Sequence, residues 1–220
     1  MARRHGFRWS VAEAWQVNAR AWRRNRRAIL TGAVVAVALI MLTGMSYAPL
    51  LADSEAPQIP AIYPVALAVP SIGIDANVQY VGVADDGSMD IPSNFEDAAW
   101  YQPGYLPGQP GNAVFDGHVS STAAEAVFFH VQDLKIGARI SVTGADGTVL
   151  TFQVAEVEMY ALDSAPVAKI FGSTGWPQVV LITCGGDWHP DLHLFDHRTV
   201  VYAPLASVSA GPAAASVTAP

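Results

Sequence analysis

Residues 179–186 read Val-Val-Leu-Ile-Thr-Cys-Gly-Gly. The β-branched and leucine side chains of Val179–Thr183 predict a buried strand, with Cys184 directly after it. A thiol at a strand end falls at the rim of a β-barrel, and the small residues Gly185 and Gly186 leave room there for a peptide. Cys184 is therefore a candidate nucleophile; the alternative is a buried structural thiol, since unpaired cysteine is commonly buried.

Six further segments are short, rich in valine and isoleucine, and separated by turn residues such as Asp86–Gly87 and Asp146–Gly147. The predicted strands are Val65–Pro70, Asn77–Val83, Gly111–Asp116, Arg139–Thr143, Val149–Tyr160 and Thr199–Ala203. Residues Ala123–His130 are expected to form a short helix. This spacing predicts an all-β barrel or sandwich.

Two further candidate groups lie at strand ends. His118 follows the run 112–117, and a histidine beside a cysteine accepts its proton or pairs with its thiolate. Arg198 begins the last predicted strand, and its permanent charge suits an oxyanion. The alternatives are a loop histidine, and a salt bridge from Arg198 to Asp187 or Asp196.

A metal site is a competing interpretation of residues 187–197. Three histidines there are four residues apart and would share one face of a helix, a spacing that can bind a metal. A solvated polar loop is the alternative. The residues concerned are Asp187, His189, Asp191, His193, Asp196 and His197. Because the chain has one cysteine, it can form neither an intrachain disulfide nor a multi-cysteine metal site.

The charge is divided unevenly along the 220 residues. Eight of the 12 basic residues stand within the first 28, while the remainder of the chain is acidic. An acidic body argues against nucleic-acid binding, which needs a basic face. Residues 28–51 carry no charge, and about 20 apolar residues in a helix cross a bilayer.

The basic cluster Arg20–Arg27 before this run places the N-terminus in the cytoplasm and the body outside. A cleaved signal peptide is the alternative, with Ser46–Ala48 as its cleavage triplet, although signal-peptide cores are normally only about 7–15 residues long. The expected organisation is a cytoplasmic basic segment (1–27), a transmembrane anchor (28–51), a Pro/Ala-rich stalk (52–64), a catalytic domain (65–206) and a flexible tail (207–220).

The chain resembles the sortases, the cysteine transpeptidases of Gram-positive surfaces. Val180–Cys184 is similar to the family's Thr-Leu-x-Thr-Cys signature, Gly117–His118 with Ser121 to its Gly-His-x-x-Ser element, and Arg198 to its arginine strand, although Arg198 stands about two residues later than in class F. Three further features resemble the actinobacterial class F sortases. The segments that carry this are Trp100–Gly104 with Pro107–Gly108, Cys184–Gly186, and Phe171–Thr174 with Pro177.

The resemblance implies a closed sortase-type β-barrel of about eight strands with one or two short helices, and no cofactor. It implies a nucleophile (Cys184), a general acid (His118) and an oxyanion donor (Arg198). The substrate would be a Leu-Pro-x-Thr-Gly-like sorting signal, cleaved between Thr and Gly, and the acceptor an amine of the cell wall or a pilin. Residues expected to contact substrate are Thr183, Gly185, Ser121, Ala165, Pro166, Ile170 and Phe171.

Two other functions fit the sequence. One is a membrane-tethered binding or scaffolding β-barrel without turnover. The other is an L,D-transpeptidase-like cell-wall enzyme, although the Ser-x-Gly-Cys context of that class is absent from the chain.

Overall fold

The computed structural model describes residues 58–121 and 124–209. Nine strands form one sheet: β1 (Pro64–Val69), β2 (Ile74–Val81), β3 (Ala98–Tyr101), β4 (Gly111–Asp116), β5 (Arg139–Gly144), β6 (Val149–Gln153), β7 (Glu156–Ala161), β8 (Pro177–His189) and β9 (Leu194–Ser209). The described helices are short: the 3₁₀ turns η1 (Pro70–Ile72) and η2 (Val131–Asp133), and α2 (Val167–Phe171).

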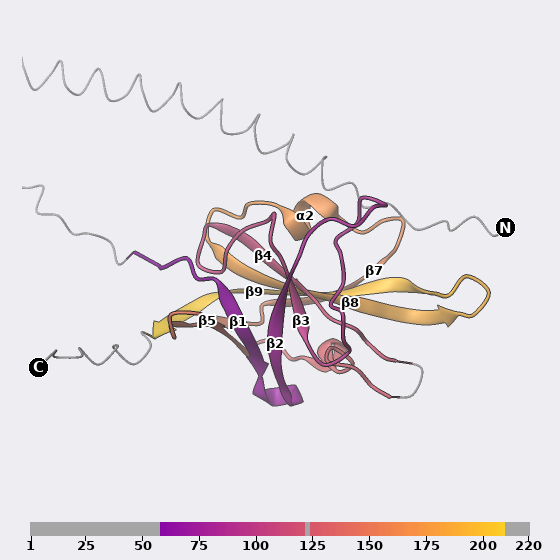
Figure 1. Cartoon of the computed structure of the whole chain (residues 1–220), viewed down its shortest axis with the longest axis horizontal. Helices are drawn as coiled ribbons and strands as arrows, with labels where there is room; N and C mark the ends of the chain where they lie inside the picture. Colours follow the sequence, from indigo (N-terminus) through magenta and orange to yellow (C-terminus); the bar gives the residue numbers. More distant parts are fainter. Residues whose placement is uncertain (1–57, 122–123, 210–220) are drawn as a thin grey trace, which may run out of the picture.

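The sheet closes on itself. Its strand order is β6-β5-β1-β2-β3-β4-β8-β9-β7, and β6 also pairs with β9. Eight strands therefore form a closed barrel. The ninth strand, β7, pairs with the first part of β9, on the same edge that pairs with β6 further along β9. The predicted closed all-β barrel of about eight strands is confirmed (Figure 1).

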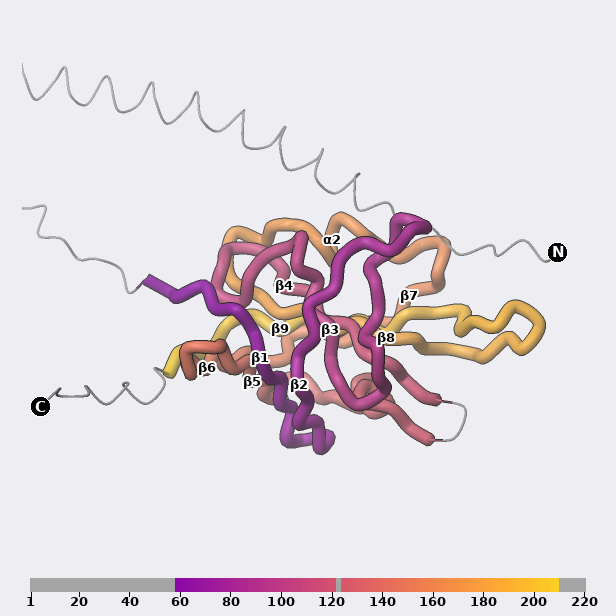
Figure 2. The backbone as a smooth tube through the Cα atoms, viewed as in Figure 1, coloured from indigo at the N-terminus to yellow at the C-terminus, as the bar shows by residue number. Residues whose placement is uncertain are grey.

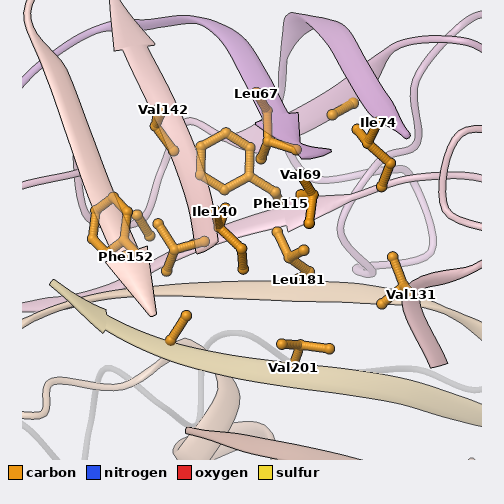
Figure 3. Packing of buried hydrophobic residues seen from close by; sticks show 14 of the residues in the cluster. Leu67, Val69, Ile74, Phe115, Val131, Ile140, Val142, Phe152, Leu181 and Val201 are labelled. Carbon is orange, nitrogen blue, oxygen red and sulfur yellow. The ribbon is translucent and has the colours of Figure 1, made fainter. Parts of the chain in front are cut away.

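The barrel interior is filled by side chains from alternate positions of the strands (Figure 3). Phe115 of β4, Leu181 of β8 and Val201 of β9 are all fully buried there. Burial of each such side chain stabilises the fold by roughly 1.5–3 kcal/mol. This alternation directs the intervening residues of the same strands to the outer face of the barrel.

A second apolar layer covers that outer face over β4, β8 and β9. Ile170 of α2 is fully buried against it, and Met89 and Phe171 pack at its edge. The buried members of the layer are Tyr101, Val114, Ile170, Val180, Ile182, Val200 and Tyr202. The next residues on the same strand faces, two positions after Val114 and Ile182 and two positions before Val200, therefore lie beside this layer.

Three local predictions were wrong. The short strand β3 was missed, because its sequence Ala-Ala-Trp-Tyr lacks the valine and isoleucine of the other strands. The predicted strand 149–160 is broken after Gln153 into β6 and β7: Val154 donates its N–H to the Ala138 carbonyl, and Ala155 donates its N–H to the Tyr202 carbonyl of β9. Residues 124–130 form no helix, because Ala126 and Phe128 donate their N–H groups to the carbonyls of Val119 and His118.

Strands β8 and β9 continue well beyond their predicted ends and form a long hairpin that projects from the barrel (Figure 1). They pair as far as His189 and Leu194, with His193 at the turn in a left-handed conformation (φ 51°). The segment 187–197 is therefore a hairpin, so its three histidines do not share the face of a helix.

The described part of the domain is wider than residues 65–206. Ile62, in the predicted stalk, is buried in the barrel core, and its N–H donates to the Pro107 carbonyl. At the other end, residues 207–209 extend β9 and pair with β6. The basic segment and the predicted anchor lie outside the described residues, and no helix in the described ranges is long and apolar enough to span a membrane.

Candidate active site

A cavity of about 320 Å³ opens on the outer face of the barrel. Its walls come from the β2–β3 connection, which is traced in Figure 2, from the ends of β4, β8 and β9, and from α2. The lining residues are Asp86, Ser88, Met89, Ile91, Asp116, Gly117, His118, Leu162, Phe171, Ile182, Cys184, Leu194 and Arg198. Cys184, His118 and Arg198 therefore lie in one cavity.

The strand register explains why these three residues meet. Cys184 on β8 lies directly opposite Arg198 on the antiparallel strand β9. On the other side of β8, the parallel strand β4 pairs Asp116 with Ile182, so two residues further on His118 comes level with Cys184. All of them share the outer-face parity of Ile182. The strand that carries the thiol thus runs between the strands that carry the imidazole and the guanidinium.

The two glycines after Cys184 are required by packing against β9. A Cβ at Gly185 would lie 2.7 Å from the Thr199 hydroxyl, and one at Gly186 would lie 2.2 Å from Asp196 Oδ1. Gly186 also has a φ of +74°, within the bulge where the β8–β9 register shifts. The expectation that these residues leave space for a peptide misses this constraint, and Gly185 does not line the cavity.

Thr183 lies on the opposite face of β8 from Cys184 and is buried. Its hydroxyl donates to the Gly117 carbonyl over 2.7 Å, and the Gly117 N–H donates to the Ile182 carbonyl. This side chain lies outside the cavity lining, and its predicted contact with substrate stays a prediction. Thr183 instead fixes the backbone just before His118.

The connection between β2 and β3 holds the His118 ring. Nε2 lies 3.1 Å from the Pro92 carbonyl, and the ring packs against Phe95 at a tilt of 43°, with 4.6 Å between centroids. A carbonyl only accepts, so Nε2 carries the proton and Nδ1 is the accepting atom of the neutral ring. Asp97 accepts bonds from Gln79 and Asn94 and thereby braces this connection. This role of Asp97 was not predicted from the sequence.

Arg198 is held by backbone carbonyls. One guanidinium nitrogen donates to the carbonyls of His197 (2.9 Å) and Phe195 (3.4 Å). Asp196 is occupied elsewhere, since it accepts from His197 Nδ1 and from the Asp187 N–H. The ion pairs among the described residues do not include Arg198, so the salt-bridge alternative is not supported.

Asp116 is a further acidic group in the cavity that the sequence analysis did not select. Burial raises the pKa of this carboxyl to about 7, against the opposing effects of the Arg198 guanidinium and the Gly117 N–H. Burial also raises the pKa of the Cys184 thiol; Arg198 lowers it and Asp116 raises it further. Cys184 is therefore a neutral thiol at neutral pH. The alternation of Val114, Asp116 and His118 on one strand face was the available signal.

The predicted groove residues divide into two groups. Phe171 lines the cavity, as does Leu162, which lies between β7 and α2. Ile170 is fully buried in the outer apolar layer, Ala165 packs against that layer, and Pro166 precedes the first turn of α2. Ser121 lies outside the cavity lining, and its hydroxyl donates to the Ala124 carbonyl.

The hairpin residues of the alternative metal site lie near one another without forming one. Asp196 accepts a hydrogen bond from His197 Nδ1, and His189 Nε2 lies 3.3 Å from Asp196 Oδ2. Across the described ranges, no group of three or more His, Cys, Asp or Glu side chains is arranged to hold a metal ion.

The Asp116→Asn substitution should change the pH dependence of stability. Between the ordinary aspartate pKa of 3.8 and about 7, the folded protein keeps a proton that the unfolded chain releases, so the free energy of unfolding falls as pH rises. A pKa raised from 3.8 to about 7 changes the free energy of unfolding by roughly 4 kcal/mol. Relative to the wild type, Asp116→Asn should therefore gain a few kcal/mol between about pH 4 and about pH 8.

Denaturant unfolding at several pH values measures this difference. Asp75→Asn, at an exposed position on β2, is the matched control for charge removal. Parallel pH profiles of Asp116→Asn and wild type would show that Asp116 has an ordinary pKa in the folded protein.

The fold has clear relatives. A family model described as the sortase domain matches residues 67–206. Sortase A from Corynebacterium diphtheriae is 19% identical, with a TM-score of 0.52 over 68% of this chain and 62% of that chain. The match to sortase C-1 from Actinomyces oris has 21% identity, a TM-score of 0.52, and covers 66% of this chain and 76% of that one.

Listeria monocytogenes sortase A is 19% identical, with a TM-score of 0.53 over 70% of this chain and 93% of that chain. At these identities the structural likeness establishes the fold. No curated protein matches the chain.

Proposed function

Because this chain belongs to the sortase family, a family of cysteine transpeptidases, we propose that it cleaves a sorting signal and transfers the product to an amine of the cell envelope. The observation that supports this proposal is that Cys184, His118 and Arg198 line the same cavity. The substrate class is a Leu-Pro-x-Thr-Gly-like peptide, cut between Thr and Gly.

The first step is attack of the Cys184 sulfur on the threonine carbonyl carbon. The thiol is neutral, so its proton passes to His118, whose Nδ1 is available. Arg198 donates to the developing oxyanion, and one such donor is worth about 3–4 kcal/mol. The C–N bond then breaks, the glycine amine leaves with the proton from His118, and a thioester remains on Cys184.

The second step is attack of an acceptor amine, or of water, on this thioester. Nothing in it requires a metal or an organic cofactor. The apolar wall from Met89, Leu162 and Phe171 suits the leucine and proline of the sorting signal.

Mass spectrometry of the intact protein tests this function. Incubation with a Leu-Pro-x-Thr-Gly peptide should add the mass of the fragment ending in threonine to Cys184, and an added amine should release that fragment as an amide. Absence of the adduct across a panel of sorting-signal peptides would favour the non-catalytic binding domain instead.

The finer assignment to class F-like sortases rests on the segments around Trp100, Gly108 and Phe171. These segments have structural roles compatible with it. Trp100 is buried and donates its indole N–H to the Tyr105 carbonyl. Gly108, at φ +97°, lies where a Cβ would collide with the Pro60 carbonyl.

We also propose that residues 28–51 anchor the protein and that the catalytic domain faces outward. Protease added to intact protoplasts should then digest the domain and leave a membrane-bound fragment of the first 50 or so residues. Detection of this fragment with an N-terminal tag measures the result. A domain that is digested only after the protoplasts are lysed would reverse the topology.

A further inference from the structure

The cavity holds a carboxyl group that the steps above do not use. Asp116 ends β4, two residues before His118, and lines the cavity with Cys184 and Arg198. Its strand parity is that of Val114, which belongs to the outer apolar layer, so the side chain rises from that layer beside the thiol. A carboxyl group on an apolar floor is costly unless it is hydrogen-bonded or paired with an opposite charge.

Asp116 shares the cavity with one guanidinium group, that of Arg198, which lowers the pKa of the carboxyl without offsetting the effect of burial. The titratable groups that share the cavity are Asp86, His118, Cys184 and Arg198. Arg198 is the only lysine or arginine among the cavity residues, and its guanidinium donates to backbone carbonyls. A carboxylate that lines an apolar cavity attracts a cation that enters it.

The acceptor amine is such a cation. A lysine side chain has a pKa of about 10.4, so near neutral pH it arrives as an ammonium and must lose a proton before its nitrogen can attack. A carboxylate beside the thioester meets both needs, because it binds the ammonium and accepts its proton. Burial brings the pKa of Asp116 to about 7, nearer to that of a useful base than an ordinary carboxyl.

We propose that Asp116 binds the amine acceptor and deprotonates it in the second half of the transpeptidation. This inference rests on the proposed function and names the residue that selects an amine over water. It makes Asp116 a catalytic residue of the aminolysis step, in addition to the three residues of the acylation step.

The protons balance as follows. The Asp116 carboxylate takes one proton from R–NH₃⁺, and the lone pair of R–NH₂ attacks the thioester carbon. The C–S bond breaks and the electron pair goes to the Cys184 sulfur. The attacking nitrogen loses a second proton to this thiolate, and the products are an amide, the Cys184 thiol and protonated Asp116. Asp116 then releases its proton to solvent.

Asp116→Asn tests the proposal, because asparagine keeps the shape and removes the charge. Cys184 is first acylated with a sorting peptide, and the decay of the thioester is followed with water alone, with a lysine peptide and with hydroxylamine. Hydroxylamine is uncharged near neutral pH and needs neither ammonium binding nor deprotonation before attack. We expect aminolysis by the lysine peptide to fall about tenfold or more, with hydrolysis and hydroxylaminolysis nearly unchanged.

Two comparisons make the outcome decisive. Asp116→Glu keeps the charge and should retain part of the lysine reaction, whereas Asp75→Asn, outside the cavity, should leave the partition between amine and water as in the wild type. An equal fall with all three nucleophiles would overturn the proposal and give Asp116 a structural role. An unchanged lysine reaction in Asp116→Asn would overturn it as well.

The test separates this inference from the proposed function. If wild-type Cys184 never becomes acylated, the proposed function fails. If it is acylated and Asp116→Asn partitions like the wild type, only the role of Asp116 fails. Acylation of Cys184 in each variant also shows that the variant is folded.

Discussion

Cys184→Ala should lower turnover of a sorting peptide by at least about a thousandfold while the barrel stays folded. The loss is large because the thioester has no other sulfur on which to form: Cys184 is the chain's one cysteine. The cost in stability should be small, about 1 kcal/mol, since the thiol already borders a cavity and leaves no new closed void.

Cleavage of the peptide measures the first effect and denaturant unfolding the second. Cys184→Ser is a useful companion, because its hydroxyl is close in size but is a far weaker nucleophile. Retained cleavage by Cys184→Ala at a rate near that of the wild type would remove the thiol from the mechanism.

The sequence predicted the barrel because its strands are marked by alternating or continuous valine and isoleucine. It also selected Cys184, His118 and Arg198, because each stands where such a run begins or ends, and the structure places the three in one cavity. The sequence could not predict the register in which the strands pair. Only the pairing of Asp116 with Ile182 and of Cys184 with Arg198 shows that three strand ends meet on one face.

Residue type alone does not show whether a residue serves the local backbone or a substrate. Thr183 and Gly185 stand beside Cys184 and were predicted to contact substrate. In the structure, the Thr183 hydroxyl bonds the Gly117 carbonyl, and Gly185 leaves room for the Thr199 side chain. Asp116 went unnoticed for the converse reason. An aspartate before a glycine is typical of a turn, and the cavity that Asp116 lines is formed by residues from distant parts of the sequence, among them Met89 and Phe171.

Arg198→Lys should lose roughly a hundredfold to a thousandfold in the rate of Cys184 acylation although the positive charge is retained. One guanidinium nitrogen already donates to the His197 and Phe195 carbonyls, which fixes the group and leaves its other N–H groups to face the cavity. Lysine has a single nitrogen on a flexible stem, so it cannot be anchored by these carbonyls and meet an oxyanion with the same geometry.

The two substitutions at this position should differ in their effect on the thiol. Arg198 lowers the pKa of Cys184, so Arg198→Ala should raise that pKa and slow alkylation by iodoacetamide at a given pH, whereas Arg198→Lys should change alkylation much less. Acylation, in contrast, should be slow in both variants, because the oxyanion exists only in and around the transition state. Acylation by Arg198→Lys at the wild-type rate would mean that charge alone suffices. If Arg198→Ala were equally fast, backbone N–H groups beyond Cys184 would have to hold the oxyanion, and the two carbonyl bonds would serve only to secure the β8–β9 hairpin.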